Sequence, residues 1–118
     1  MKLNFITFMV RDIEKSIAFY QGLAGLQVVN RISPPAGEIA FLANEKGGTM
    51  LEFIAFEGTE KVSTKGMAMN FSADIELGEL RDKAISLGYS PSEIFAGGPK
   101  PKHFKVADPD GTIVEFGV

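Results

Sequence analysis

Cysteine is absent from the 118-residue sequence, and histidine occurs only once. Without cysteine, the chain has no disulfide framework, no thiolate zinc site and no cysteine nucleophile. Basic residues are in the minority, since 12 Lys and Arg stand against 15 Asp and Glu, and this argues against binding to the phosphate backbone of nucleic acids. The N-terminal apolar run in MKLNFITFMVRD is too short for a signal peptide or a membrane span. We therefore expect a cytoplasmic protein with no nucleic-acid partner and no membrane partner.

The sequence does contain an internal repeat. GTMLEF at 48–53 matches GTIVEF at 111–116 when the sequence is aligned with itself, so that Glu52 falls on Glu115. The same offset pairs Phe8 with Phe71, Gly25 with Gly88 and Phe41 with Phe104. The length, with 45% hydrophobic and 23% charged residues, fits one globular domain. We interpret the chain as a single domain, 1–118, made of two similar halves, 1–60 and 61–118.

Both halves are predicted to contain the same elements in the same order, βαβββ. Runs of strand-forming residues open the halves at 4–10 and 67–73. Helices follow at 13–24 and 76–87, with acidic N-caps at Asp12 and Asp74 and with C-terminal glycines at Gly25 and Gly88. Three strands complete each half, at 26–32, 38–44 and 49–56 and at 89–95, 102–107 and 112–117. The predicted fold class is α+β, with two tandem βαβββ modules.

Alternation along these strands separates two faces. One face is wholly apolar and includes Phe8, Phe53 and Phe116, so we expect it to form the core under the helices. The opposite face is mixed, and its candidate ligand-pocket residues are Phe5, Thr7, Met50, Glu52, Asn70, His103, Lys105 and Glu115. Polar groups that converge from several strands are typical of a binding cleft, whereas the plain alternative is a sheet face open to water. We favour the cleft, because Phe5 and Met50 are too apolar for an open face.

Two segments carry a family resemblance, FMVRDIEKSIAFYQGLAGLQVV at 8–29 and VADPDGTIVEF at 106–116. An aromatic pair, Phe19-Tyr20, precedes a Gly-Leu step in the first, and a DPDG turn precedes a Glu-bearing strand in the second. The sequence resembles the vicinal oxygen chelate superfamily of glyoxalases, bleomycin resistance proteins and extradiol dioxygenases over essentially its whole length. This resemblance implies a cupped mixed β-sheet built by both modules, with a helix from each module on its outer face. It also implies a homodimer.

The resemblance also implies where a metal would bind. Metal-using members often place a His on the first strand of a module and a Glu or His on the fourth, and these positions match Phe5, Ala68, Glu52 and Glu115. Phe5 and Ala68 have no lone pair to donate, so the site is reduced to two carboxylates, with His103 on the same face as a further donor. We expect no cofactor and no metal site. A divalent ion held weakly at Glu52 and Glu115, with water in the remaining positions, is the alternative.

Two main classes of function follow for the mixed face. The first is a protein that binds or sequesters a small molecule, as the resemblance implies for members that sequester cationic antibiotics; Glu52, Glu115, Phe5 and Phe41 would line such a pocket. The second is a lyase or isomerase in which Glu52 and Glu115 approach each other, so that one carboxyl group holds a proton and the pair acts as general acid and base. An inert network, in which Lys105 neutralises one glutamate, is the alternative to chemistry. A third class is an interaction module with a vestigial pocket.

One basic cluster stands next to the glycine-rich stretch 97–98. It comprises Lys100, Lys102, His103 and Lys105. Such a cluster could attract an anionic ligand such as a phosphonate or a carboxylate, but we expect Lys100 and Lys102 to point to water in a solvated loop.

The reduced donor set makes the absence of a resident metal testable. We expect elemental analysis of the purified, dialysed protein to find no stoichiometric nickel, zinc, iron or manganese, because Phe5 and Ala68 are not ligands. The double variant Phe5→His with Ala68→His should acquire a divalent site that the parent lacks. A tightly held ion in the parent, in stoichiometric amount, would contradict the prediction.

Overall fold

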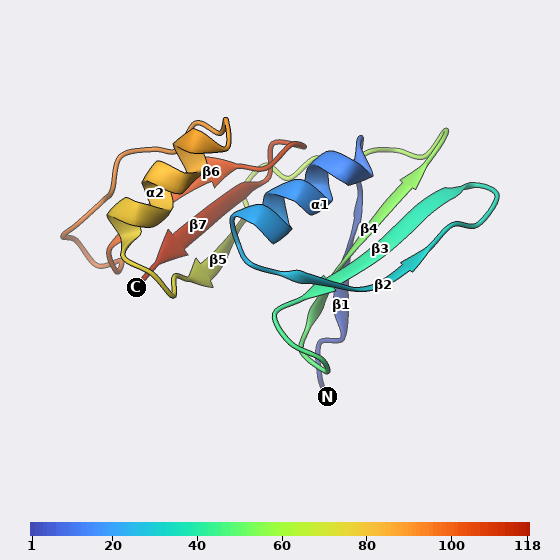
Figure 1. Cartoon of the computed structure of the whole chain (residues 1–118), viewed down its shortest axis with the longest axis horizontal. Helices are drawn as coiled ribbons and strands as arrows, with labels where there is room; N and C mark the ends of the chain where they lie inside the picture. The colour runs from blue at the N-terminus through green and yellow to red at the C-terminus, as the bar shows by residue number, and fades with distance from the viewer. The chain divides into compact units, whose positions relative to one another are not determined.

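Each half of the sequence forms one helix and one mixed β-sheet in a computed structural model, which describes residues 1–118 (Figure 1). The chain divides into two compact units, Met1–Val62 and Ser63–Val118, which we call the first and second modules and describe separately. Their boundary lies close to that between the predicted halves, 1–60 and 61–118. The predicted α+β class is confirmed. Both helices have ten residues, and neither has the length and apolar character that a membrane crossing requires.

The first module contains four strands and one helix. In chain order they are β1 (Phe5–Met9), α1 (Ile13–Gly22), β2 (Gln27–Ile32), β3 (Gly37–Ala43) and β4 (Met50–Phe56). The strands lie in the order β1-β4-β3-β2, with β1 parallel to β4 and the other pairs antiparallel. Because α1 packs across one face of this sheet (Figure 1), the opposite face is the one on which a site can be built.

The second module contains three strands and one helix. In chain order they are β5 (Ala68–Ser72), α2 (Leu77–Ser86), β6 (His103–Ala107) and β7 (Ile113–Gly117). The strands lie in the order β5-β7-β6, with β5 parallel to β7 and β6 antiparallel to it. The last strand of the sequence is therefore the central strand of this sheet.

The strand predicted at 89–95 is wrong, because this segment forms only an isolated bridge to the first residue of β6. The Ser92 N–H donates to the carbonyl of Lys105 (2.8 Å), but the Lys105 N–H donates to the Ser92 hydroxyl (2.9 Å) rather than to a backbone carbonyl. The Ser92 carbonyl instead accepts a hydrogen bond from Arg81 Nε on α2 (2.8 Å). At Ser92, side chains thus replace backbone bonds of a ladder, and the preceding Pro91 has no N–H to contribute. Backbone bonds in both directions join only Phe95 to His103.

The parallel strand pairs of the two modules have the same register. The aligned residues are Phe5 with Met50 and Thr7 with Glu52 on β1 and β4, and Ala68 with Ile113 and Asn70 with Glu115 on β5 and β7. Each residue of the pairs in the second module is the one that the sequence repeat aligns with the corresponding residue of the first module. Glu52 and Glu115 are therefore equivalent: each lies inside the last strand of its module, beside a polar residue of the first strand.

The helix ends follow the sequence signals at three of four positions. Asp12 caps α1 as predicted, because its carboxylate accepts the N–H of the third helical residue (3.1 Å). The predicted cap at Asp74 is wrong: α2 begins later, and Glu76 accepts the N–H groups of the second and third helical residues (3.0 Å each). These two bonds lower the pKa of Glu76. Gly25 and Gly88 have φ of +71° and +92°, the left-handed conformation expected after a helix.

Aromatic rings on the helix side of each sheet form the core. In the first module the ring of Phe53 lies 5.2 Å from that of Tyr20 on α1 and 6.1 Å from that of Phe8, between centroids. In the second module the rings of Phe104 and Phe116 lie 5.5 Å apart. All five side chains are at most 5% exposed, so the predicted core face is confirmed at these positions. Burying rings of this size is worth about 1.5–3 kcal/mol each.

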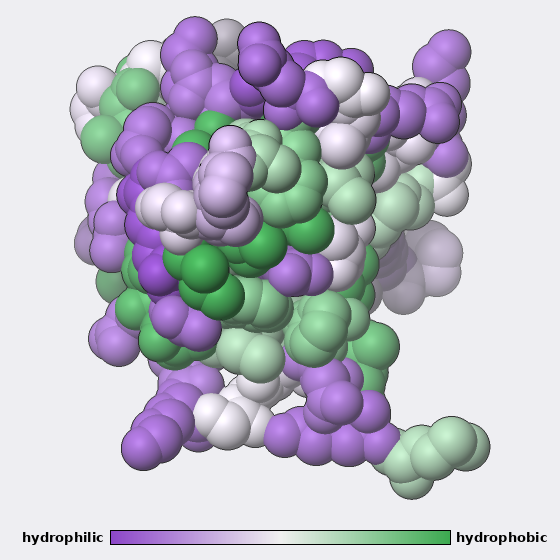
Figure 2. Space-filling view, turned by 90° about the vertical axis from the view of Figure 1, so that its right-hand side faces the viewer, coloured by the Kyte–Doolittle hydropathy of each residue, from purple (hydrophilic) through white to green (hydrophobic).

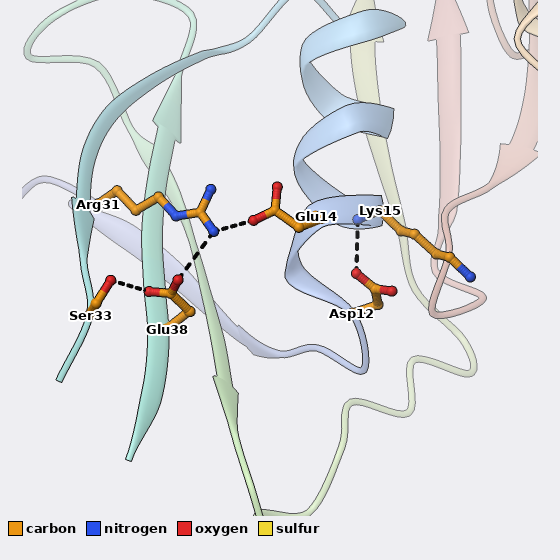
Figure 3. A network of polar contacts seen from close by, with 6 residues as sticks. All are labelled: Asp12, Glu14, Lys15, Arg31, Ser33 and Glu38. Carbon is orange, nitrogen blue, oxygen red and sulfur yellow. Dashed lines mark hydrogen bonds and ion pairs between the residues drawn. The ribbon is translucent and has the colours of Figure 1, made fainter. Parts of the chain in front are cut away.

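A polar network joins α1 to the adjoining strands of the first module (Figure 3). Arg31 of β2 contacts Glu14 of α1, and its Nη2 lies 3.4 Å from Glu38 of β3. Ser33 donates a hydrogen bond to the same Glu38. Because these side chains are partly exposed, each ion pair contributes at most about 1 kcal/mol. The network therefore links the helix to the sheet but contributes little to stability.

The two acidic residues before α2 should differ in their effect on stability. We expect Glu76→Ala to lower the melting temperature by a few degrees, because it leaves two helical N–H groups without their acceptor. Asp74→Ala, the matched control, should leave the melting temperature nearly unchanged. Thermal melts of both variants check this, and equal losses in the two would contradict the assignment of Glu76 as the cap.

Candidate functional site

Glu52 lies inside the sheet of the first module, on the face opposite α1. Its neighbours in register are Thr7 on β1 and Phe41 on β3. Thr7 Oγ1 donates a hydrogen bond to Glu52 Oε1 (2.5 Å), and the glutamate is only 9% exposed. Leu51 and Phe53, on either side of it in β4, are buried on the helix side, so the carboxylate cannot turn away from its face without breaking the strand.

The surroundings of Glu52 on this face are mainly apolar. The strand registers place the side chains of Phe5, Met9, Ile39, Phe41, Met50 and Ile54 on the same side of the sheet as Glu52. The rings of Phe5 and Phe41 meet edge to face, 5.5 Å apart, and Phe5 remains 43% exposed. On the surface of the molecule, hydrophobic side chains gather at the centre of one face with hydrophilic ones around them (Figure 2). A single carboxylate within apolar side chains can chemically accept a cation or a hydrogen-bond donor.

Glu115 occupies the equivalent position in the second module but has different partners. It is 3% exposed, and Asn70 Nδ2 on β5 donates to its Oε1 (3.2 Å). Lys100, in the loop before β6, donates to its Oε2 (2.5 Å). The Lys100 ammonium, aided by Asn70, holds the pKa of the Glu115 carboxyl below its usual value, although burial opposes this shift. The expectation that Lys100 points to water is therefore wrong, and no signal in the sequence indicated this contact.

Lys105 is the register neighbour of Glu115, but the ion pair between them, considered above as the alternative to chemistry, does not form. Its Nζ instead lies 5.9 Å from the centroid of the Phe95 ring. His103, on the same face, packs its ring 5.5 Å from that of Phe95, and its Nδ1 lies 2.7 Å from the carbonyl oxygen of Pro101. Since a carbonyl only accepts, Nδ1 carries the proton, and in the neutral ring Nε2 holds the lone pair.

A difference of one position in the pairing gives the two glutamates different neighbours. In the first module Glu52 pairs with Phe41 on β3, but in the second module Glu115 pairs with Lys105 on β6. Phe104, the partner of Phe41 in the sequence repeat, directly precedes Lys105 and lies instead on the core face, fully buried. The loop between the last two strands is one residue shorter in the second module, and this shortening accounts for the displacement. The two phenylalanines therefore do not occupy equivalent positions in the structure, although the sequence repeat pairs them.

The donors for a metal are few within each module. Phe5 and Ala68 lie on the first strands beside β4 and β7, as the sequence indicates, and they offer no lone pair. No group of three or more His, Asp or Glu side chains lies together. In the second module both Glu115 oxygens already accept hydrogen bonds from protein groups. The residues of either module therefore do not fit a tightly bound metal, and the metal-free state remains a prediction.

The placement of the candidate residues supports the predicted face within each module. The first module brings together Phe5, Thr7, Met50 and Glu52, and the second brings together Asn70, His103, Lys105 and Glu115. That the two glutamates approach each other remains a prediction, because each belongs to a different module. Phe41, expected with Phe5 to line a pocket, does lie beside Glu52. Lys100 was missing from the candidate pocket residues, although it contacts Glu115.

Comparisons with known proteins agree with this architecture. Residues 2–116 match the family model of the Glyoxalase/Bleomycin resistance protein/Dioxygenase superfamily. The chain is similar to the uncharacterized protein YwbC of Bacillus subtilis (strain 168), with 28% identity over 98% of this chain and 95% of that one. Among solved structures it is similar to TnmS3, an antibiotic binding protein from Streptomyces sp. CB03234, with a TM-score of 0.76 and 16% identity over 99% of this chain and 94% of that one. The trypanothione-dependent glyoxalase I of Leishmania major gives a TM-score of 0.79 and 20% identity, with 99% and 86% covered. At these identities the structures share the fold alone.

The ion pair between Lys100 and Glu115 should make stability depend on pH. Because the pKa of Glu115 is lowered in the folded state, its ionised form stabilises the fold above the unfolded pKa of about 4.3. This contribution is lost as the pH falls through the lower, folded pKa. We expect Lys100→Met to reduce the free energy of unfolding by roughly 1 kcal/mol at pH 7 and to flatten the acid limb of the profile.

The control for this prediction is Lys46→Met, since Lys46 is exposed and forms no ion pair, and it should leave the profile unchanged. In a Glu115→Gln background, Lys100→Met should have little further effect. Denaturant unfolding from pH 3 to pH 7 measures all four variants. Additive effects of the Lys100 and Glu115 substitutions would mean that the ion pair contributes nothing.

Proposed function

Because the chain belongs to the Glyoxalase/Bleomycin resistance protein/Dioxygenase superfamily, we propose that it binds and sequesters a small organic molecule without a resident metal. The observation that carries the proposal is the position of Glu52, a nearly buried carboxylate among apolar and aromatic side chains on the open face of the first module. The similar fold of TnmS3, an antibiotic binding protein, supports the same class of function. The ligand we propose has an apolar, preferably aromatic, body and a cationic or hydrogen-bond-donating group.

The partners of Glu52 favour this ligand chemistry. Thr7 supplies one hydrogen bond to Oε1, which leaves Oε2 without a donor among the described contacts. The body of a ligand on this face displaces the water that solvates the carboxylate, which costs free energy. A charged donor on the ligand compensates for this cost better than a neutral one, because hydrogen bonds between ionised groups are stronger. Phe5 and Phe41, edge to face at 5.5 Å, offer the ring surface on which an aromatic body or an onium group packs.

The alternative function, a lyase or isomerase that uses Glu52 and Glu115 as acid and base, has less support. A general acid must hold a proton near neutral pH, but Lys100 and Asn70 lower the pKa of Glu115 and so favour its ionised form. Glu115 would therefore serve in such a reaction only as a fixed charge or a weak base. The expected homodimer belongs to the same proposal, and sedimentation velocity of the purified chain tests it.

The ligand preference can be tested with two probes of the same shape. Naphthylmethylammonium and naphthylmethanol share an aromatic body but differ in charge. We expect isothermal titration calorimetry to give tighter binding of the ammonium compound, and Glu52→Gln to weaken that binding about tenfold, since a hydrogen bond to a charged group is worth about 1.5–3 kcal/mol. Phe41→Ala should weaken both probes, because it removes apolar contact from each.

Glu57→Gln is the matched control, because Glu57 is an exposed glutamate that directly follows β4. This variant should bind both probes as the parent does. The proposal is overturned if the parent binds the two probes equally, or if Glu52→Gln preserves the preference for the ammonium compound. Circular dichroism of each variant ensures that a loss of binding is not a loss of folding.

A further inference from the structure

Residues 96–102 join the isolated bridge at Phe95 to β6, and we call this segment the strap. Every residue of the strap is exposed, so none of them is buried in the core of the module. Backbone bonds fix its two ends: Phe95 exchanges two with His103 (2.7 and 3.1 Å), and the carbonyl of Lys102 accepts the N–H of Val118 (3.3 Å). Between these ends, only polar contacts hold the strap in place.

Two side chains of the sheet make these contacts. The carboxylate of Glu115 accepts a hydrogen bond from Lys100 Nζ (2.5 Å), and His103 Nδ1 donates to the carbonyl of Pro101 (2.7 Å). The ion pair joins unlike partners, since the Lys100 side chain is 53% exposed and that of Glu115 is 4% exposed. Salt screens an ion pair that has an exposed partner, and such a pair contributes little free energy. The contact can therefore open without unfolding of the module.

The beginning of the strap can absorb this movement. Gly97 and Gly98 have φ of +87° and +81°, and no atom beyond the neighbouring residues lies within 4 Å of the point where a Cβ would stand on either. Because glycine has no Cβ, it adopts positive and negative φ about equally readily. Consecutive glycines in open surroundings are suited to act as a hinge, so that Lys100 can leave the sheet while Phe95 stays in place.

The internal repeat indicates what Lys100 does at Glu115. In both modules the polar neighbour on the first strand donates to Oε1 of the glutamate, Thr7 to Glu52 and Asn70 to Glu115. The other oxygen of Glu52 accepts no hydrogen bond among the described contacts, whereas that of Glu115 accepts the Lys100 ammonium group. The strap therefore brings a cation of the chain itself to a carboxylate oxygen that stays open in the equivalent position.

From these features we infer that the strap is autoinhibitory: Lys100 occupies Glu115 as an internal cation, and opening at Gly97 and Gly98 makes this carboxylate available to an organic cation. A tethered group competes at an effective concentration in the millimolar range, so an external cation must match it or be aided by salt. The inference does not rest on the proposed function, because it concerns the other module and an occupant that belongs to the chain.

The experiment uses n-butylammonium as the probe, since it has the same chemistry as the lysine side chain. In isotope-labelled full-length protein, its binding at Glu115 is followed by the side-chain amide signal of Asn70. We expect Lys100→Met to bind the probe about fivefold more tightly than the parent, because up to that factor is lost in competition with an exposed ion pair. Lys100→Arg retains the cation and should bind as the parent does, as should Lys46→Met, an exposed lysine of the first module.

Salt tests the opening in the parent itself. Raising sodium chloride from about 0.01 M to about 1 M shortens the Debye length from about 30 Å to about 3 Å, which weakens the ion pair. We expect the amide signals of Gly97 and Gly98 to shift in the parent and in Lys100→Arg, but to move much less in Lys100→Met, whose strap is already released. The signal of Gly25, after α1, serves as the internal control.

Three results would each overturn the inference. They are a parent whose Gly97 and Gly98 signals do not respond to salt, a Lys100→Met variant that binds n-butylammonium no better than the parent, and binding that persists when Glu115→Gln is added to Lys100→Met. Circular dichroism checks that each variant is folded, and the salt titration of the parent requires no substitution. None of these results affects the binding of naphthylmethylammonium at Glu52, so the two proposals fail separately.

Discussion

The parallel pairing of the first and last strands within each module is the constraint on which the candidate sites depend. It places a glutamate inside a strand, with core residues on both sides of it in sequence, and the carboxylate cannot turn towards the helix side. A buried carboxylate costs free energy unless hydrogen-bond donors meet it. The neighbouring first strand supplies such a donor at the paired position, Thr7 for Glu52 and Asn70 for Glu115.

The two modules satisfy this requirement in different ways. Glu115 receives an amide and an ammonium group from its own module, so its charge is neutralised without a ligand. Glu52 receives one hydroxyl and is otherwise surrounded by apolar side chains, including Phe5 and Phe41. Equivalent positions in the repeat therefore have different surroundings: Glu115 makes an ion pair within its own module, whereas one carboxylate oxygen of Glu52 accepts no hydrogen bond among the described contacts.

The ion pair at Glu115 also determines the surroundings of Lys105. Lys105 lies opposite Glu115 in the strand register and would neutralise it in the simplest arrangement. Because Lys100 takes that role, Lys105 instead lies near the ring of Phe95. A lysine from the loop, and not the lysine of the neighbouring strand, thus neutralises Glu115.

Local patterns in the sequence were sufficient for much of the fold. The core faces followed from alternation, since a side chain in a strand must point to one side or the other, and α1 and its cap followed from Asp12 and the helical spacing. The internal repeat predicted the equivalence of Glu52 and Glu115, because parallel strands with matched connections keep the same register. The cap of α2 was missed because Asp74 and Glu76 are both acidic, and only the start of the helix distinguishes them.

Only the tertiary structure decided the partners of the polar groups. The segment at 89–95 pairs with β6 only by a bridge at Phe95, because at Ser92 the carbonyl accepts from Arg81 and the side-chain hydroxyl accepts the N–H of Lys105. Phe41 and Lys105 became the neighbours of the two glutamates because a loop one residue shorter displaces the pairing in the second module. Lys100 reached Glu115 through the path of a glycine-rich loop. Alternation and spacing are properties of neighbouring residues, whereas these contacts join residues that chain length and loop path bring together only in the folded protein.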